Sequence, residues 1–225
     1  LVPEKKVLVV ADAARARAAR RLLPGLPKSA FLVEPRARNT APALMLATAR
    51  VFLENPEAVV AALPADHLIR DEKRFRTVLR AGAEMAGRDK ALVVFGIPPT
   101  YPATGYGYIR HDRAAGRKAG GTPFYPVTAF KEKPNVAQAD EYLASGDYAW
   151  NSGMFLWRAD VFARTLEDCA PELGPAWNGL LEALRSGRAG KLRAAFNLAP
   201  ALSIDYALME KAEGVVVADG DFGWS

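Results

Sequence analysis

Two carboxylates follow short apolar runs in this sequence, at positions where a charged side chain could do chemistry. The first is Asp66, which follows an apolar run that predicts a strand. The carboxyl end of a parallel strand is where open α/β sheets bind ligands. A carboxylate there could hold a Mg²⁺ ion that bridges phosphate oxygens. The alternative is that Asp66 only caps a helix.

The second carboxylate is Glu34, which leaves a predicted strand just before a helix. Asn39 or Thr40 can cap that helix and Pro42 fits its first turn, so those residues need no function. This leaves Glu34 unexplained. A carboxylate there could accept both the N1–H and the N2–H of guanine, whereas adenine presents an acceptor at N1. The segment therefore predicts a guanine-reading role for Glu34.

Two further segments place glycines or polar groups beside predicted strands. Gly105 and Gly107 flank an aromatic residue at the start of a strand, where glycine allows either a turn or the close approach of a ligand. Glu132 and Lys133 follow one apolar strand, and Asn151 adjoins another. Polar groups at strand edges commonly bind sugar hydroxyls, although Glu132 and Lys133 could simply be exposed charges.

Other catalytic classes are not indicated. The chain has two histidines and one cysteine, Cys169, and no Ser-His-Asp, Cys-His or Cys-x-x-Cys arrangement can be assembled. A structural zinc site would need four ligands. What remains is a reaction whose nucleophile is already ionised, such as phosphoryl or nucleotidyl transfer. A single cysteine cannot form a disulfide within the chain and predicts a reducing, cytoplasmic location.

These side chains must be positioned by alternating strands and helices. We expect strands at 7–10, 31–34, 59–63, 91–97, 106–110, 126–130, 154–157 and 215–217. We expect helices at 13–23, 41–53, 71–86 and 135–145, three more between 160 and 199, and a last one capped by Ser203. Residues 111–121 are expected to form a solvated hairpin or flap. Strand–helix–strand alternation predicts an α/β fold with a mostly parallel central sheet and helices on both faces.

Composition bounds the function further. The chain has 225 residues, of which 50% are hydrophobic and 24% charged, so it is a globular chain rather than a disordered or low-complexity one. No internal repeat or Pro/Gly/Ser-rich linker divides it, so we expect one domain over residues 1–225. The net charge of +5 fits a phosphorylated small molecule, and the basic helix at 13–23 lacks interleaved aromatics, so no nucleic acid is expected. No apolar run approaches the roughly 18–20 residues of a membrane span, so no membrane partner is expected either.

Taken in order, these segments resemble the sugar-phosphate nucleotidyltransferases, and among them the bacterial mannose-1-phosphate guanylyltransferases. Eight strings in register carry the resemblance: Glu34–Pro42, Leu63–His67, Phe95–Ile97, Thr104–Ile109, Phe130–Pro134, Trp150–Phe155, Ser203–Ala207 and Asp221–Ser225. Each is weak alone, but together they span nearly the whole chain. The resemblance implies a Rossmann-like nucleotidyltransferase domain. It also implies a reaction that joins GTP and mannose 1-phosphate to give GDP-mannose and pyrophosphate.

The resemblance also implies roles for individual residues. Asp66 would be a Mg²⁺ ligand and, with Lys133, catalytic. The nucleotide would be bound by Glu34, Asn39 and Thr40. The sugar phosphate would be bound by Gly107, Glu132, Lys133 and Asn151, and Asp205 would have a supporting role. The sugar phosphate would attack the α-phosphorus in line. It needs no general base, because the second pKa of a phosphate monoester is about 6 and the group is already mostly dianionic. Lys133 and Mg²⁺ would offset the charge on the transferring group.

Some family features are not found. The family opens with a Gly-x-Gly-x-Arg loop that wraps the triphosphate, and it carries an aspartate just past the final Trp-Ser; this sequence has neither. Ala37 stands where the family usually has glycine. The sequence does not begin with Met, and we expect it to belong to a longer protein that has both missing pieces. This polypeptide alone is expected to show little or no turnover.

Three alternatives stay open. The first is a related enzyme that transfers a uridylyl or thymidylyl group to glucose 1-phosphate. The second is a non-catalytic regulatory paralogue that binds nucleotide sugars. The third, a nucleic-acid-binding domain, rests only on the net charge. The sequence does not fix the oligomeric state, and a homodimer is one option.

Overall fold

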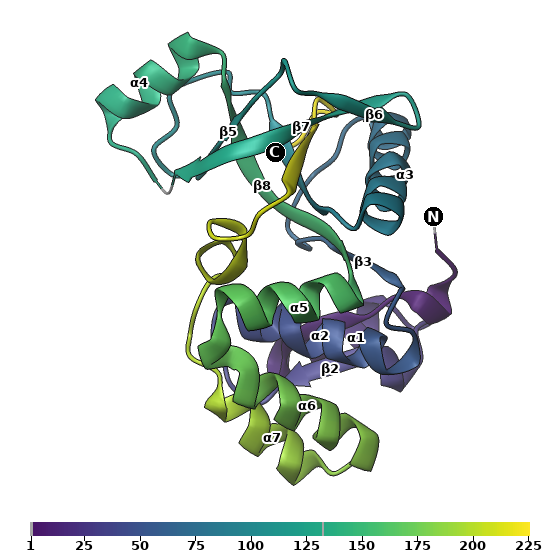
Figure 1. The fold of residues 1–225 in the computed structure, drawn as a ribbon. Helices are drawn as coiled ribbons and strands as arrows, with labels where there is room; N and C mark the ends of the chain where they lie inside the picture. Colours follow the sequence, from purple (N-terminus) through teal and green to yellow (C-terminus); the bar gives the residue numbers. More distant parts are fainter. Residues whose placement is uncertain (1, 132) are drawn as a thin grey trace. The chain divides into compact units, whose positions relative to one another are not determined.

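The computed structural model describes residues 2–131 and 133–225. The chain divides into two compact units. Unit 1 comprises Leu1–Ala58 and Phe162–Lys211, and unit 2 comprises Val59–Val161 and Ala212–Ser225 (Figure 1). Among the helices of the described part of the chain, none is both long and apolar enough to cross a membrane.

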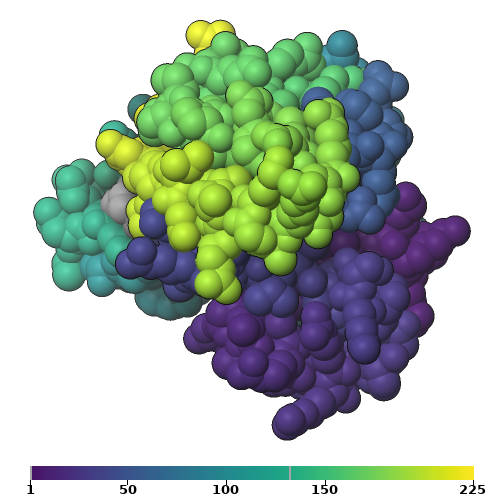
Figure 2. Space-filling model, turned by 90° about the horizontal axis from the view of Figure 1, so that it is seen from below, coloured from purple at the N-terminus to yellow at the C-terminus, as the bar shows by residue number. Residues whose placement is uncertain are grey.

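Unit 1 contains a small parallel sheet and several helices. Its elements include β1 (Val9–Asp12), α1 (Ala13–Leu22), β2 (Phe31–Glu34), α2 (Thr40–Glu54), most of α5 (Ala159–Cys169), α6 (Gly174–Ser186), α7 (Ala189–Leu198) and a π-helical turn at Asp205–Met209. The ring of Trp177 on α6 packs against Phe52 of α2 and Phe162 of α5, with ring centroids 5.6 Å and 5.9 Å apart. Helices α6 and α7 pack side by side on the yellow-green surface in Figure 2.

Unit 2 is built around a seven-stranded sheet. Its elements are β3 (Val59–Ala62), α3 (Glu72–Asp89), β4 (Leu92–Ile97), β5 (Tyr108–His111), β6 (Arg117–Ala119), β7 (Thr122–Lys131), α4 (Val136–Ser145), β8 (Tyr148–Arg158) and β9 (Val215–Asp219). The strand order is β3-β8-β4-β9-β7-β5, with β6 beside β7. Strand β5 also pairs with the start of β8, so β8, β4, β9, β7 and β5 form a closed ring of pairings.

The predicted α/β class is confirmed, but the prediction of a mostly parallel sheet is wrong. Among the described strand pairs of unit 2, only β4 and β9 run parallel; the others are antiparallel. Strand β8, from the second half of the sequence, lies between β3 and β4 and runs opposite to both. Alternation along the chain predicts the type of each element. It does not show that a later strand inserts between two earlier ones.

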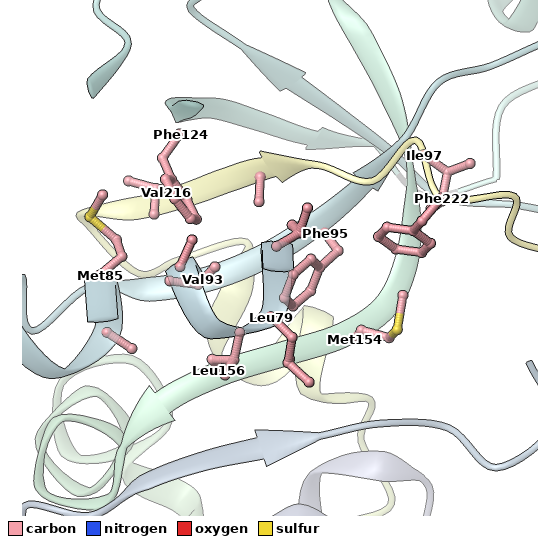
Figure 3. Close-up of a cluster of buried hydrophobic side chains, with 14 of the residues drawn as sticks. Leu79, Met85, Val93, Phe95, Ile97, Phe124, Met154, Leu156, Val216 and Phe222 are labelled. Atoms are coloured by element: carbon pink, nitrogen blue, oxygen red, sulfur yellow. The ribbon is translucent and has the colours of Figure 1, made fainter. Parts of the chain in front are cut away.

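The core of unit 2 lies between α3 and the sheet. Helix α3 is capped by Asp71, since the Asp71 carboxylate accepts from the backbone N–H of Arg74 at 2.8 Å. Figure 3 shows the apolar cluster, in which α3 contributes Leu79 and Met85 and the strands contribute Phe95 and Leu156. Apolar residues recur along α3 at the helical period, which gives it one buried face.

Close packing on the sheet requires a glycine at position 96. A Cβ atom added there would lie 2.6 Å from the Cβ of Ala149 and 2.7 Å from Cγ2 of Val217. We expect Gly96→Ala to lower the free energy of unfolding by about 1–3 kcal/mol, because an overpacked core must shift backbone or rotamers. A denaturant titration against Gly105→Ala, whose added methyl meets nothing within 4 Å, checks this. Equal midpoints for the two variants would contradict it.

Candidate functional site

In unit 1, two carboxylates lie side by side at the carboxyl ends of parallel strands. Strands β1 and β2 end with Asp12 paired to Glu34. The carboxylate of Asp12 caps α1, accepting from the backbone N–H groups of Ala14 at 2.8 Å and Arg15 at 2.9 Å, and it also pairs with the Arg15 guanidinium. Sequence reasoning singled out Glu34 and missed Asp12. The signal was present, since Asp12 also follows an apolar run.

The environment of this pair drives the two pKa values apart. Burial raises the pKa of Glu34, and the like charge of Asp12 raises it further, against a smaller opposing effect of Arg15. The pKa of Asp12 is lowered, mainly by the backbone and side-chain hydrogen bonds that it accepts from Arg15. Asp12 therefore stays ionised, and Glu34 is a half-buried carboxyl that takes up a proton more readily than an ordinary glutamate.

Asn39 and Thr40 begin α2. The side chain of Asn39 caps the helix by accepting from the backbone N–H of Thr40 at 2.8 Å, so the predicted capping role is confirmed. The hydroxyl of Thr40 accepts from the backbone N–H of Ile204 at 2.8 Å. Asn39 has φ 66° and ψ −171°, a region that costs a non-glycine residue about 1–3 kcal/mol. The predicted nucleotide-binding role of Asn39 and Thr40 stays a prediction.

In unit 2, Asp66 follows β3 in an exposed turn. The expected geometry is wrong in one respect, because β3 is an edge strand paired antiparallel with β8 rather than one of several parallel strands. The turn is fixed by the C-terminal segment: the backbones of Leu68 and Ser225 exchange two hydrogen bonds, at 2.8 and 3.0 Å. The strings around Asp66 and Asp221–Ser225, 155 residues apart in the sequence, are thus neighbours.

Gly107 and Asn151 are in direct contact. The backbone N–H of Asn151 donates to the carbonyl of Gly107 at 2.8 Å, where β5 and β8 meet. Gly107 does not have a positive φ, and an added Cβ would meet its nearest neighbours only at 3.6 and 3.7 Å. Neither a turn nor protein packing therefore requires glycine at position 107.

Lys133 lies near the same end of the sheet. It follows β7, whose Lys131 pairs with Tyr108, and Tyr108 pairs in turn with Trp150. The side chain of Lys133 is exposed. Glu132, the other residue predicted in this segment, lies outside the described residues.

A row of aromatic rings joins these positions, and sequence reasoning missed it. The distances between ring centroids are 5.2 Å from His67 to Trp224 and 5.4 Å from Trp224 to Tyr106. They are 5.2 Å from Tyr106 to Trp150 and 4.9 Å from Trp150 to Tyr101. Three of these residues directly neighbour Asp66, Gly107 and Asn151 in the sequence. The row thus brings the Asp66 turn and the Gly107–Asn151 contact to one part of unit 2.

Polar ring atoms of this row lack partners within the described chain. The indole nitrogens of Trp150 and Trp224 and Nδ1 of His67 are buried without a hydrogen bond. Burial lowers the pKa of His67, against a smaller upward effect of the Asp66 carboxylate, so the imidazole is neutral at pH 7. A buried polar atom without a partner costs free energy, so these three nitrogens are unsatisfied in the described part of the chain.

A separate cavity of about 210 Å³ in unit 2 is not part of this arrangement. Its lining includes His111, Arg113, Tyr125 and Asp219, and none of the residues predicted to bind substrate. The Nε of Arg113 donates to Nε2 of His111 at 3.1 Å. Burial, followed by the charge of Arg113, lowers the pKa of His111. The buried imidazole of His111 is therefore neutral and serves as an acceptor.

The structure thus groups the predicted residues by unit. Asp66, Gly107 and Asn151 come together in unit 2, where Lys133 follows a strand of the same sheet. Glu34, Asn39 and Thr40 belong to unit 1, on two elements that follow each other in the chain. The described residues thus place the aromatic row in unit 2 and the half-buried carboxyl of Glu34 in unit 1.

Comparison with known proteins gives a consistent family. A family model described as nucleotidyl transferase matches residues 3–194. Xanthan biosynthesis protein XanB of Xanthomonas campestris pv. campestris strain B100 is 42% identical over 205 residues, which cover 89% of this chain and 42% of XanB. Mannose-1-phosphate guanylyltransferase of Escherichia coli K12 is 40% identical over 200 residues, which cover 87% of this chain and 41% of that protein.

A solved structure agrees over the full chain. The Thermus thermophilus protein described as a mannose-1-phosphate geranyltransferase superposes with a TM-score of 0.86 and 34% identity, covering 100% of this chain and 62% of that one. The chain spans about two fifths of the length of the two sequence relatives above. The family model, which matches residues 3–194, includes the larger part of both units. This chain therefore belongs to the nucleotidyl transferase family.

Proposed function

We propose that the protein transfers GMP from GTP to mannose 1-phosphate, giving GDP-mannose and pyrophosphate. The observation that carries this proposal is the grouping of Asp66, Gly107 and Asn151 in unit 2: Gly107 and Asn151 share a backbone hydrogen bond, and the aromatic row links them to His67, the neighbour of Asp66. The substrates follow from the relatives, among which the Escherichia coli protein is named mannose-1-phosphate guanylyltransferase. A cytoplasmic location, which rests on the single cysteine, and a homodimer stay predictions.

The chemistry requires positioning and charge rather than proton transfer. An oxygen of the sugar phosphate forms a bond to the α-phosphorus of GTP, the bond from that phosphorus to the bridging oxygen breaks, and pyrophosphate leaves with the electron pair. The nucleophile is already an anion near neutral pH, so no residue has to remove a proton. The exposed ammonium of Lys133 offsets charge on the transferring group. Gly107 and Asn151 hold the sugar phosphate.

The residues present fit a Mg²⁺ ion held together with substrate. Within the described residues, no group of three or more His, Cys, Asp or Glu side chains could hold a metal by itself. Mg²⁺ is usually bound through one or two carboxylates and the phosphates of the substrate, so the single exposed carboxylate of Asp66 suffices for such a site. When bound, the ion supplies positive charge that stabilises the phosphoryl oxygens.

The guanine specificity is assigned to Glu34. Its carboxylate accepts the N1–H and N2–H of guanine, whereas adenine would place an acceptor against it. The neighbouring carboxylate of Asp12 caps α1, pairs with Arg15 and stays ionised. Glu34 must be ionised to accept two hydrogen bonds, so the raised pKa of Glu34, which burial and then the like charge of Asp12 cause, makes guanine binding sensitive to acid.

Guanine binding should weaken in acid at a higher pH than an ordinary glutamate would cause. The ionised form of Glu34 binds, its pKa is raised, and binding is therefore lost as the pH falls through a value above the usual 4.5. We expect the ratio of the affinity for GTP to that for ATP to decline as the pH falls. In Asp12→Asn, which removes the like charge, the pH at which half of this decline has occurred should be lower. Titration of both nucleotides checks this, because their phosphates ionise alike. A ratio that stays constant between about pH 5 and 7, where neither base is protonated, would contradict it.

The proposal is tested by pyrophosphate release from the full-length protein. GTP, ATP, UTP and dTTP are each paired with mannose 1-phosphate and with glucose 1-phosphate. We expect GTP with mannose 1-phosphate to have the highest kcat/KM. Preference for UTP or dTTP with glucose 1-phosphate would show the related uridylyl or thymidylyl enzyme. Tight binding of GDP-mannose without any turnover would show a regulatory paralogue, and either result overturns the proposal.

A further inference from the structure

Strand β8 contains an irregularity that the proposed function does not use. Between the pairs Val94–Phe155 and Gly96–Asn151, β4 advances two residues while β8 advances four. Two residues of β8 are therefore extra, which makes a β-bulge directly after Asn151. Gly153 within the bulge has φ +69°, in the left-handed region. Bulges bend a strand and redirect its side chains, and they occur often next to active sites.

The hydroxyl of Ser152 closes this bulge. Ser152 is only 3% exposed. Its Oγ donates to the carbonyl of Phe95 on β4 at 2.7 Å and accepts from the backbone N–H of Met154 at 3.3 Å. A bulge removes backbone groups from the regular ladder, and buried groups of this kind need other partners. One serine hydroxyl supplies both partners and ties the bulged segment to the neighbouring strand.

The bulge in turn fixes the orientation of Asn151. The side-chain Oδ1 of Asn151 accepts from the backbone N–H of Gly153 at 3.0 Å. The backbone N–H of Asn151 donates to Gly107 at 2.8 Å. The side chain of Asn151 is therefore held by the bulge on one side, and its backbone is held by β5 on the other. Any movement of residues 152–153 changes where the amide of Asn151 points.

We infer that Ser152 is a positioning residue for the sugar phosphate. It locks the bulge, the bulge orients Asn151, and Asn151 with Gly107 holds the sugar phosphate. The identity of the ligand rests on the proposed function; the lock itself rests on the hydrogen bonds of Ser152 and Gly153. Ser152 touches no reacting atom. Its loss changes how well the sugar phosphate is held rather than the chemical step.

Kinetics of Ser152→Ala test this role in the full-length protein. We expect the KM for mannose 1-phosphate to rise about tenfold, equivalent to about 1.4 kcal/mol, with little change in kcat or in the KM for GTP. Gly153→Ala should act alike: its added methyl comes no closer than 3.8 Å to Pro64, so it perturbs only the strained backbone. The matched control is Val216→Ala, which removes buried volume on β9 and lowers stability without touching the bulge.

Hydrogen exchange separates this inference from the proposed function. In Ser152→Ala, the amides of residues 151–154 should exchange faster than in the wild type, and in Val216→Ala they should not, when both are compared at equal stability. Equal exchange in the two variants, or a KM for mannose 1-phosphate that changes no more than in Val216→Ala, overturns the inference. If the wild type turns over no nucleotide with any sugar phosphate, the proposed function fails, and exchange alone decides whether Ser152 locks the bulge.

Discussion

Replacing Asp66 by asparagine is expected to lower kcat/KM for GDP-mannose formation by about 10²–10³-fold, the range seen when one electrostatic contact to the transition state is removed. The amide has nearly the same shape as the carboxylate and lacks its charge, so it holds Mg²⁺ poorly. Asp66 is exposed and makes no hydrogen bond or ion pair with the other described residues, so the fold should be unaffected. Steady-state rates at increasing Mg²⁺ measure the effect.

A nearby carboxylate serves as the control for Asp66. Asp71 caps α3, so Asp71→Ala, which removes the cap, should lower the melting temperature and leave the Mg²⁺ dependence unchanged. Asp66→Asn should do the opposite, with an unchanged melting temperature and a higher Mg²⁺ requirement. Wild-type rates and wild-type Mg²⁺ dependence in Asp66→Asn would remove Asp66 from the site.

Replacing Glu34 by glutamine is expected to lower the preference for GTP over ATP by about 5- to 150-fold. A glutamine offers one acceptor and one N–H₂ group, so one N–H of guanine loses its partner and faces another donor. A bidentate contact of this kind discriminates between bases by about 1–3 kcal/mol, and 1.4 kcal/mol corresponds to tenfold. The ratio of kcat/KM for the two nucleotides is the measurement.

Glu54→Gln is the matched control for this substitution. Glu54 is also in unit 1, where it pairs with Arg50 and Lys6 on the surface, so its loss should leave nucleotide preference unchanged. If Glu34→Gln keeps the wild-type ratio, guanine is read elsewhere in the protein. The predicted roles of Asn39 and Thr40 in nucleotide binding would then need another ligand contact to support them.

Local signals predicted many elements correctly. The strand Phe31–Glu34 has the predicted bounds, and Asn135 caps α4 with a full capping box, since Asn135 and Gln138 each bond the backbone of the other. These features depend on residues only a few positions apart. Ser203 was predicted to cap a helix, and its hydroxyl accepts from the backbone N–H of Tyr206 at the start of the π-helical turn.

Features that depend on distant partners were predicted less well. Strand β8 was expected at 154–157 and runs from Tyr148 to Arg158, because the bulge at Ser152 and Gly153 interrupts the alternation that marks a strand. Its insertion between β3 and β4 makes the sheet mixed. The segment 111–121, expected as a solvated flap, contains the short strand β6. None of these pairings is visible in the local pattern.

The candidate site divides in the same way. Asp66, Gly107 and Asn151 could be predicted because each stands beside an apolar run in a recognisable string, and the family that those strings implied is confirmed. The aromatic row could not be predicted. Its members come from separate segments of the chain, which are brought together by long-range pairings such as those of Ile69 with Trp224 and of Tyr108 with Trp150. Asp12 follows an apolar run, as Glu34 does, but that the two carboxylates are neighbours is visible only in the pairing of β1 with β2.

The most direct test of the proposed reaction follows the oxygen atoms. Mannose 1-phosphate labelled with ¹⁸O at its non-bridging phosphate oxygens is incubated with GTP, Mg²⁺ and the full-length protein, and the products are examined by ³¹P NMR and mass spectrometry. Attack of the sugar phosphate on the α-phosphorus predicts GDP-mannose with all label on the mannose-bearing phosphate, one labelled oxygen lying in the bridge, and unlabelled pyrophosphate. Label in pyrophosphate, or no GDP-mannose at all, would contradict the account.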